Sequence, residues 1–142
     1  MSEERLSVAD YPLAERRRDI VRGKRGKGLD EITLEALLED RVTIEDLRIT
    51  AAALRQQAEI ARAAGRATLA ANFERGAELV DVPQDTIMRI YELLRPGRAQ
   101  SPEELLAAAR ELREQHRAPG IAAFVEEAAA VYERRGLFKK RF

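Results

Sequence analysis

Hydrophobic residues recur at helical spacing along most of the chain after Leu29. Between residues 66 and 80, apolar side chains stand four, four and three positions apart, which places them on one face of a helix. Two later segments, 83–95 and 119–135, show the same pattern. The three predicted buried faces consist of Leu69, Phe73, Ala77 and Val80; of Ile87, Ile90, Tyr91 and Leu94; and of Ile121, Phe124, Val125, Ala128, Val131 and Tyr132. No segment alternates with a period of two, so we expect an all-α fold of short-to-medium helices without a sheet.

Residues with capping chemistry mark where the helices begin and end. The side chains of Thr33, Thr43 and Thr50 stand where they can accept a hydrogen bond from the free N–H groups that open a helix. Ser101, followed by Pro102 and three residues later by Glu104, fits a capping box. Glycine stands at or just after three of the predicted helix ends. The predicted helices span residues 33–40, 43–48, 50–65, 66–80, 83–95, 101–117 and 119–135.

The first 28 residues lack helical periodicity. They contain Pro12, three glycines and a dense basic run, because seven lysines and arginines but only one aspartate lie between Arg16 and Lys27. We therefore predict an extended basic N-terminal arm over residues 1–28 and a helical domain over residues 29–142. An arm without a core of its own would be ordered by a partner.

The composition favours a subunit of a complex. Alanine accounts for 24 of the 142 residues, and it favours helices but fills little volume, which suits close helix packing or a core that another chain completes. Positive and negative side chains balance at 25 each, so no overall field attracts nucleic acid or a membrane. The sequence has no cysteine and no apolar run long enough to cross a bilayer. Residues 1–10 lack the apolar core of a secretory signal, so we expect a cytoplasmic protein.

Few residues could carry catalysis. His116 is the only histidine, which excludes a histidine metal cluster, and in the last turn of a predicted helix it suits the helix dipole. Ser101 lies fifteen residues earlier on the same predicted helix, about 22 Å away at 1.5 Å per residue, so the two cannot form a nucleophile pair. The glycine-rich stretch 23–28 does not have the spacing of a phosphate-binding loop. We therefore expect no catalytic, cofactor-binding or metal-binding residue in this chain.

The basic run leaves alternatives open. It could contact the phosphates of nucleic acid, although no aromatic residue is interleaved to stack on bases, or it could bind an acidic protein surface. A free-standing helical adaptor that uses this arm is therefore one alternative, and it predicts salt-sensitive retention on DNA. A small helical enzyme is another, and the single histidine and the lack of cysteine disfavour it.

A long ordered series of short motifs identifies a family. The motifs are DYPLA at 10–14, LDEITLE at 29–35, RIT at 48–50, LRxQAxIA at 54–61, AGR at 64–66, LAxNFERxAEL at 69–79, VPxDxI at 82–87, IY at 90–91, LRP at 94–96, EELLA at 103–107 and AAFV at 122–125. In their order and spacing, from about residue 10 to residue 135, they resemble the small (gamma) subunit of the adenosylcobalamin-dependent diol and glycerol dehydratases.

The resemblance implies a dimer of large–medium–small heterotrimers. The large subunit would hold the substrate and a cation, and adenosylcobalamin would lie between the large and medium subunits. Homolysis of the cobalt–carbon bond would start a radical 1,2-shift that converts a 1,2-diol or glycerol to an aldehyde and water. The small subunit would be helical and would pack on and stabilise the large catalytic subunit. The preference for glycerol or propane-1,2-diol would be decided in another chain.

If the chain is such a subunit, its functional residues are those that bind the large subunit. Arginine can bond a carboxylate through two N–H groups, which suits an interface or an internal role equally. The candidates come from the arm and from the central motifs: Tyr11, Pro12, Leu13, Arg48, Arg55, Gln57, Arg66, Asn72 and Arg75. Some small subunits carry an amphipathic extension that directs them into bacterial microcompartments. The nine residues before Asp10 are too short for a convincing one, so encapsulation stays an open alternative.

Overall fold

The protein has an all-α fold in the part of the chain that its computed structural model describes, residues 4–139. The chain divides into two compact units, Met1–Val80 and Asp81–Phe142. Apart from one isolated bridge between Arg22 and Gly28, residues 4–139 contain no strand. The expectation of an all-α fold without a sheet is therefore confirmed.

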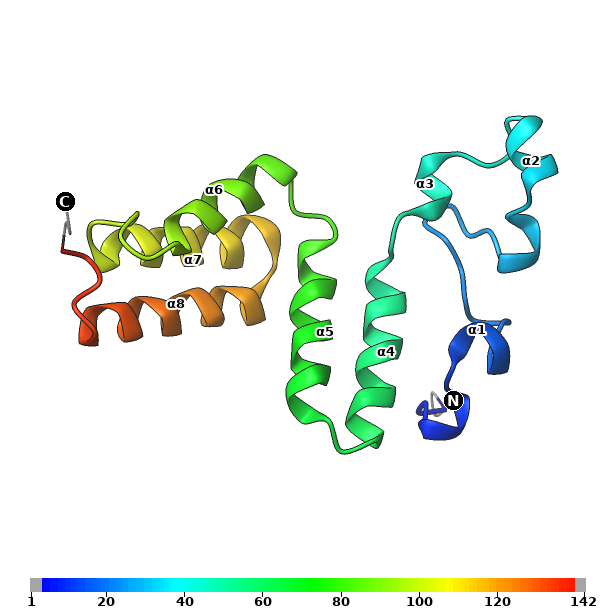
Figure 1. Ribbon diagram of the computed structural model, residues 1–142, viewed down its shortest axis with the longest axis horizontal. Coiled ribbons are helices and arrows are strands. Elements are labelled where there is room, and N and C mark those ends of the chain that lie inside the picture. The colour runs from blue at the N-terminus through cyan, green and yellow to red at the C-terminus, as the bar shows by residue number, and fades with distance from the viewer. Residues whose placement is uncertain (1–3, 140–142) are drawn as a thin grey trace. The chain divides into compact units, whose positions relative to one another are not determined.

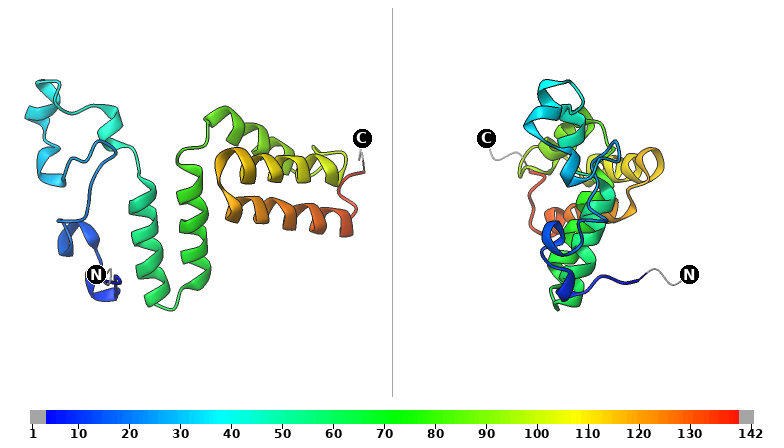
Figure 2. Two further views of the ribbon diagram at one scale, coloured as in Figure 1. Left: turned by 180° about the vertical axis from the view of Figure 1, so that it is seen from behind. Right: turned by 90° about the vertical axis from the view of Figure 1, so that its right-hand side faces the viewer.

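Two antiparallel helices, α4 (Ala51–Ala63) and α5 (Ala67–Leu79), lie side by side in the first unit (Figures 1 and 2). The Thr50 hydroxyl accepts a hydrogen bond from the N–H of Ala53 at 3.0 Å, which confirms Thr50 as the N-cap of α4. Gly65 ends this helix with a φ of +75°, a left-handed conformation that glycine adopts without steric cost.

Small side chains fill the contact between α4 and α5. Ala58, Ala61 and Ala70 form one buried cluster, against which Phe73 packs. Because alanine has no atoms beyond Cβ, the two helix backbones approach closely here. The alanine content therefore serves close helix packing in this unit, which is one of the two uses that the composition suggested.

Before α4, extended stretches alternate with short helical turns. The turns are η1 (Val8–Asp10), α1 (Leu13–Arg16) and η2 (Leu29–Glu31). Leu6 and Leu13 are buried with Ile60 of α4, and Ile20 and Val21 pack against this cluster. The N-terminal segment thus uses α4 of its own chain as the other half of a small apolar core.

Two very short helices, α2 (Leu34–Leu38) and α3 (Ile44–Leu47), join the N-terminal segment to α4 (Figure 1). The Thr33 hydroxyl accepts a hydrogen bond from the Ala36 N–H at 3.1 Å and so caps α2. Thr43 is the N-cap residue of α3, where its N–H donates to Asp46 Oδ2 at 2.9 Å, but its side chain makes no capping hydrogen bond. Both threonines therefore stand at the N-cap positions that the sequence predicted, and only Thr33 caps through its hydroxyl.

The second unit is built from α6 (Gln84–Leu94), α7 (Pro102–His116) and α8 (Pro119–Arg134). Helices α7 and α8 form an antiparallel hairpin (Figures 1 and 2). Arg117, with a φ of +51°, reverses the chain between them. The largest fully buried side chains of the described residues are Leu105, Leu112 and Val125, all in this hairpin.

Three side chains that the sequence placed on buried faces are exposed. Leu69 of α5 is 38% exposed, Tyr91 of α6 is 57% exposed and Phe124 of α8 is 44% exposed. Helical periodicity identifies the apolar side of a helix, but it does not say how much of that side a neighbour covers. Each of the three stands beside a buried neighbour, Ala70, Ile90 or Val125, and so lies at the edge of the covered strip.

The start of α7 also differs from the predicted capping box. The Ser101 side chain makes no capping hydrogen bond. Glu104 instead accepts a hydrogen bond from the Gln100 N–H at 2.8 Å, one residue earlier than a capping box requires. The helix still begins at Pro102, because proline at the first helical position needs no hydrogen-bond partner for its nitrogen.

Candidate functional site

The basic run of the N-terminal segment is paired with carboxylates of its own chain. Five of the seven basic side chains between Arg16 and Lys27 have such a partner within 4 Å. The pairs are Arg17 with Asp10 and Asp19, Arg18 with Asp30, Arg22 with Glu31, Lys24 with Glu45, and Arg25 with Asp46. Single exposed pairs of this kind add little stability. Together, however, they neutralise most of the positive charge that made the run conspicuous.

Asp46 is the buried anchor of this network. Its carboxylate accepts hydrogen bonds from two nitrogens of the Arg25 guanidinium, with 2.8 Å to Nε, and from the Thr43 N–H at 2.9 Å. The Arg25 guanidinium lowers the pKa of Asp46 from 3.8 to about 2, so this carboxylate is charged at neutral pH. Gly23 allows the close approach, because a Cβ there would lie 2.6 Å from the carbonyl oxygen of Asp46.

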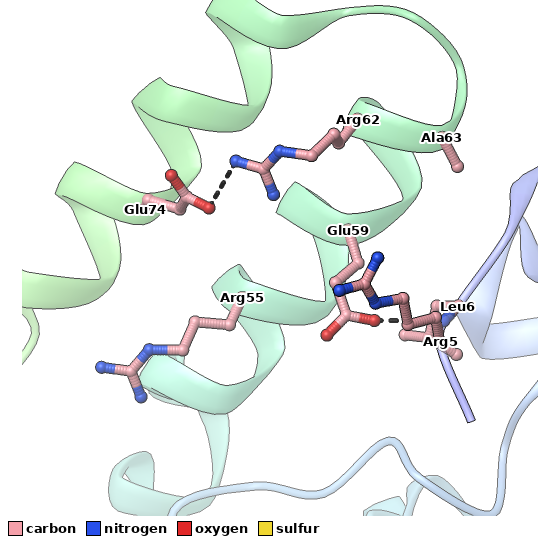
Figure 3. A pocket seen from close by; sticks show the side chains of 7 residues that line it. All are labelled: Arg5, Leu6, Arg55, Glu59, Arg62, Ala63 and Glu74. Atoms are coloured by element: carbon pink, nitrogen blue, oxygen red, sulfur yellow. Dashed lines mark hydrogen bonds and ion pairs between the residues drawn. The ribbon is translucent and has the colours of Figure 1, made fainter. Parts of the chain in front are cut away.

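A charged groove runs along one side of α4 (Figure 3). Its lining residues are Arg5, Leu6, Arg55, Glu59, Arg62, Ala63 and Glu74. Arg62 and Glu74 form an ion pair of 2.6 Å between α4 and α5, and the Leu6 N–H donates to Glu59 Oε2 at 3.1 Å. Arg55 extends away from these contacts in Figure 3, and its guanidinium has no ion-pair partner among residues 4–139.

An apolar groove runs along another side of α4. It is lined by Val8, Tyr11, Gln57, Ile60, Ala61, Ala64, Arg66, Leu69 and Phe73. Three of the candidate residues, Tyr11, Gln57 and Arg66, thus come together, the first from the N-terminal segment and the others from the α4–α5 hairpin. Tyr11 is 60% exposed and Arg66 is exposed at the N-cap of α5, so both can reach a partner.

The remaining candidates make contacts within their own chain. Leu13 is buried against Leu6 and Ile60, and Pro12 is half-buried after a cis peptide bond. Arg48 pairs with Glu45 at 3.1 Å. The Asn72 carbonyl oxygen accepts a hydrogen bond from Arg75. The nine candidates therefore do not form one site, and the geometry leaves Tyr11, Arg55 and Arg66 as those with the least internal engagement.

The residues considered for catalysis lie apart. Ser101 and His116 stand at opposite ends of α7. The His116 side chain is 17% exposed, and its Nε2 lies 3.9 Å from Glu111 Oε1. Within residues 4–139, no group of three or more histidines and carboxylates could hold a metal ion. Nor does any helix in that range have the length and apolar character needed to span a membrane.

The sequence reasoning missed a second group of surface residues, on α2, on α3 and just after α3. Leu34, Leu37, Leu38, Ile44, Leu47 and Ile49 are each more than half exposed. A signal for them was present, since Leu34, Leu37 and Leu38 follow the i, i+3, i+4 spacing of one helix face. That spacing alone does not distinguish a face turned to the chain's own core from one turned to solvent.

Comparisons with known proteins agree along nearly the whole chain. The model of the dehydratase small subunit family matches residues 6–139. The propanediol dehydratase small subunits of Citrobacter freundii and of Salmonella typhimurium strain LT2 are each 50% identical to this chain over 132 residues. That stretch covers 93% of this chain and 76% of each relative. The chain therefore belongs to the dehydratase small subunit family.

Proposed function

We propose that this chain is the non-catalytic small subunit of an adenosylcobalamin-dependent propanediol or glycerol dehydratase, a hydro-lyase. In that complex, a radical 1,2-shift would convert a 1,2-diol or glycerol to an aldehyde and water. This chain would pack on the large subunit and stabilise it within a dimer of large–medium–small heterotrimers. The complex would act in the cytoplasm, with encapsulation in a bacterial microcompartment as a separate question.

One observation carries the proposal, the 50% identity to two propanediol dehydratase small subunits across 93% of the chain. Such similarity over nearly the full length supports the same place in the same kind of complex. The separation of Ser101 from His116 along α7 is consistent with a binding role rather than a catalytic one.

The ion pairs of the basic run weaken the alternative of an adaptor that binds nucleic acid or an acidic protein surface. A phosphate or a partner carboxylate would have to displace carboxylates that already contact these side chains. Asp46, for example, holds Arg25 through two hydrogen bonds. Binding of nucleic acid through this run should therefore be weak, and it should fall steeply with added salt.

We place adenosylcobalamin between the large and medium subunits and not on this chain. A bound cofactor is usually enclosed over most of its surface. The charged groove and the apolar groove of α4 are both open to solvent, and the first is crossed by the ion pair between Arg62 and Glu74. Both grooves therefore lack the enclosure that a cofactor site usually has.

The proposal is tested by recovering the complex through an affinity tag on the large subunit, with all three chains co-expressed. This chain should co-purify with the large and medium subunits. Replacing Arg55 by alanine should lower its recovery, because Arg55 is exposed and has no ion pair within residues 4–139 to lose. Arg110 of α7, also exposed, provides a matched control in the second unit. Unchanged recovery of the Arg55→Ala variant would remove Arg55 from the interface, and failure of the wild-type chain to co-purify would contradict the proposed function.

A further inference from the structure

Exposed apolar side chains are concentrated in one short part of the chain. Of the thirteen large hydrophobic residues that are markedly exposed among those described, six lie between residues 34 and 49. Their exposed fractions run from 51% for Leu37 to 76% for Leu38. Scattered exposed hydrophobic residues are normal on any protein, but a contiguous group marks a surface that something else covers.

Helical geometry shows that these side chains point away from their own unit. In α2, Leu34, Leu37 and Leu38 lie on one side, whereas Ala36, which is 1% exposed, lies on the opposite side. In α3, Ile44 and Leu47 share the outer side. Each helix therefore turns its large apolar residues outward, and the residue that it buries in its own unit contributes little apolar area.

In α3 the buried residue is charged, whereas the apolar residues face outward. Asp46 is 2% exposed and is fixed by Arg25 and by the Thr43 N–H, so α3 is attached to the rest of its unit by charge and hydrogen bonds. Helices of five and four residues are not stable by themselves. With so little apolar burial of their own, α2 and α3 are suited to gain stability from a partner.

Several charged residues of the same part of the chain are already paired. Arg41 bonds Glu39 at 2.7 Å, Arg48 pairs with Glu45 at 3.1 Å, and Arg18 pairs with Asp30. Glu35 and Asp40 have no ion pair among residues 4–139, so the uncompensated charge of this segment is negative and would not attract a polyanion. An apolar centre within a polar rim is the usual build of a protein–protein interface.

We propose that the outer faces of α2 and α3, with Ile49 just after α3, bind an apolar surface of the large dehydratase subunit. These residues are named here the α2–α3 surface (Leu34, Leu37, Leu38, Ile44, Leu47 and Ile49). This inference rests on the proposed function and adds the place of contact. A stable interface needs about 800 Å² from each partner, or about 20–30 residues a side. The sixteen residues from 34 to 49 are fewer than that, so this surface would form one part of the contact. The large subunit is the occupant proposed, because the chain belongs to a family of dehydratase small subunits, which implies larger partner subunits.

The test compares two matched pairs of substitutions in the full-length chain. The first is Leu38→Gln with Leu47→Gln, on the α2–α3 surface. The second is Met88→Gln with Leu106→Gln, which changes two exposed residues of the second unit, 50% and 40% exposed. Affinity for the large subunit, co-purified with the medium subunit, is measured for each. The first pair should weaken binding roughly tenfold or more, as expected when anchors of an interface are lost, and the second pair less than about threefold.

Two further measurements separate a lost contact from a lost fold. Circular dichroism of the free chain should be the same for wild type and for both variant pairs, since exposed side chains contribute little to stability. Hydrogen exchange needs no substitution: the amides of residues 34–49 should exchange rapidly in the free wild-type chain and slowly in the complex.

The possible outcomes are distinct. If the wild-type chain does not bind the large subunit, the proposed function itself fails. If wild type binds, and the α2–α3 variant has the same affinity as wild type or as the control variant, the docking surface is overturned while the proposed function stands. A second copy of this chain could instead cover the surface. In that case residues 34–49 would exchange slowly in the free chain, and sedimentation would show a dimer that the first pair of substitutions dissociates. This outcome would also overturn the inference.

Discussion

Replacing Leu105 by alanine should destabilise the second unit by about 3 kcal/mol. Leu105 is completely buried in α7, and the substitution removes three carbon atoms. At about 0.8 kcal/mol for each buried methylene, the lost transfer free energy is about 2.4 kcal/mol. The cavity that remains adds to this, because surrounding side chains relax only partly, and fully buried leucines lose about 2.7–5.0 kcal/mol in comparable substitutions. Small domains have a total stability of only about 5–15 kcal/mol, so the effect should be large.

The next residue in the chain provides the control. Leu106 is 40% exposed and lies in the same turn of α7, so Leu106→Ala changes helix propensity equally but removes much less buried surface. It should cost about 1 kcal/mol or less. The two substitutions therefore separate core packing from every effect that depends only on the residue type.

Hydrogen exchange is the appropriate assay, because two units need not unfold together. The opening free energy of the α7 and α8 amides should fall by about 3 kcal/mol in Leu105→Ala, and that of the α4 and α5 amides should not change. A loss below about 1 kcal/mol, or equal losses for Leu105→Ala and Leu106→Ala, would refute the packing of the α7–α8 hairpin described here.

Three further predictions concern the first unit. Gly76→Ala should stabilise the free chain by about 1 kcal/mol, because it removes a glycine from the interior of α5. The new Cβ would lie 3.7 Å from Leu54 Cδ1, which is an ordinary contact. A lower midpoint of thermal unfolding would contradict this prediction. The pKa of Asp46 is lowered from 3.8 to about 2 in the folded chain, so its contribution to stability is present above about pH 4 and is lost as the pH falls toward 2. In urea unfolding across that range, Asp46→Asn should lose less free energy of unfolding than wild type. A pH profile unchanged by the substitution would argue against the Arg25 contact. Gly23→Ala should force the basic run away from α3, because its Cβ would lie 2.6 Å from a backbone oxygen, and unchanged protection of the α3 amides would contradict that close approach.

Local chemistry allowed most of the fold to be predicted from sequence. Thr33 and Thr50 cap helices through their hydroxyls where the sequence placed them, because an N-cap depends on one side chain and on backbone N–H groups at most three residues away. Thr43 also stands at the N-cap of α3, although its side chain makes no capping hydrogen bond. The absence of period-two alternation correctly indicated an all-helical chain. At Ser101 the same kind of reasoning was wrong in detail, since Glu104 bonds the Gln100 N–H instead.

Long-range pairing could not be predicted in the same way. The basic run was visible in the sequence, but its partners, such as Asp30 and Asp46, lie twelve and twenty-one residues from the arginines they bind. Nothing in the local pattern says that an acidic segment folds back onto a basic one. The same limitation applied to Leu69, Tyr91 and Phe124, because the width of a covered helix face depends on which other helix lies against it.

The candidate binding residues show what a family resemblance does and does not supply. The resemblance identified the family from residues spread over the chain, and the comparisons confirmed it. It did not distinguish residues that bind a partner from residues that support the fold. Leu13, buried in its own unit, and the exposed leucines of α2 were therefore not separable until burial was known.

The central claim is that this chain completes a dehydratase without catalysing the reaction itself. The most direct measurement is aldehyde formation from propane-1,2-diol with added adenosylcobalamin, by the large and medium subunits with and without this chain. We expect activity and a stable complex only when this chain is present, and no turnover by this chain alone. Full assembly and full turnover by the other two subunits without it would contradict the account.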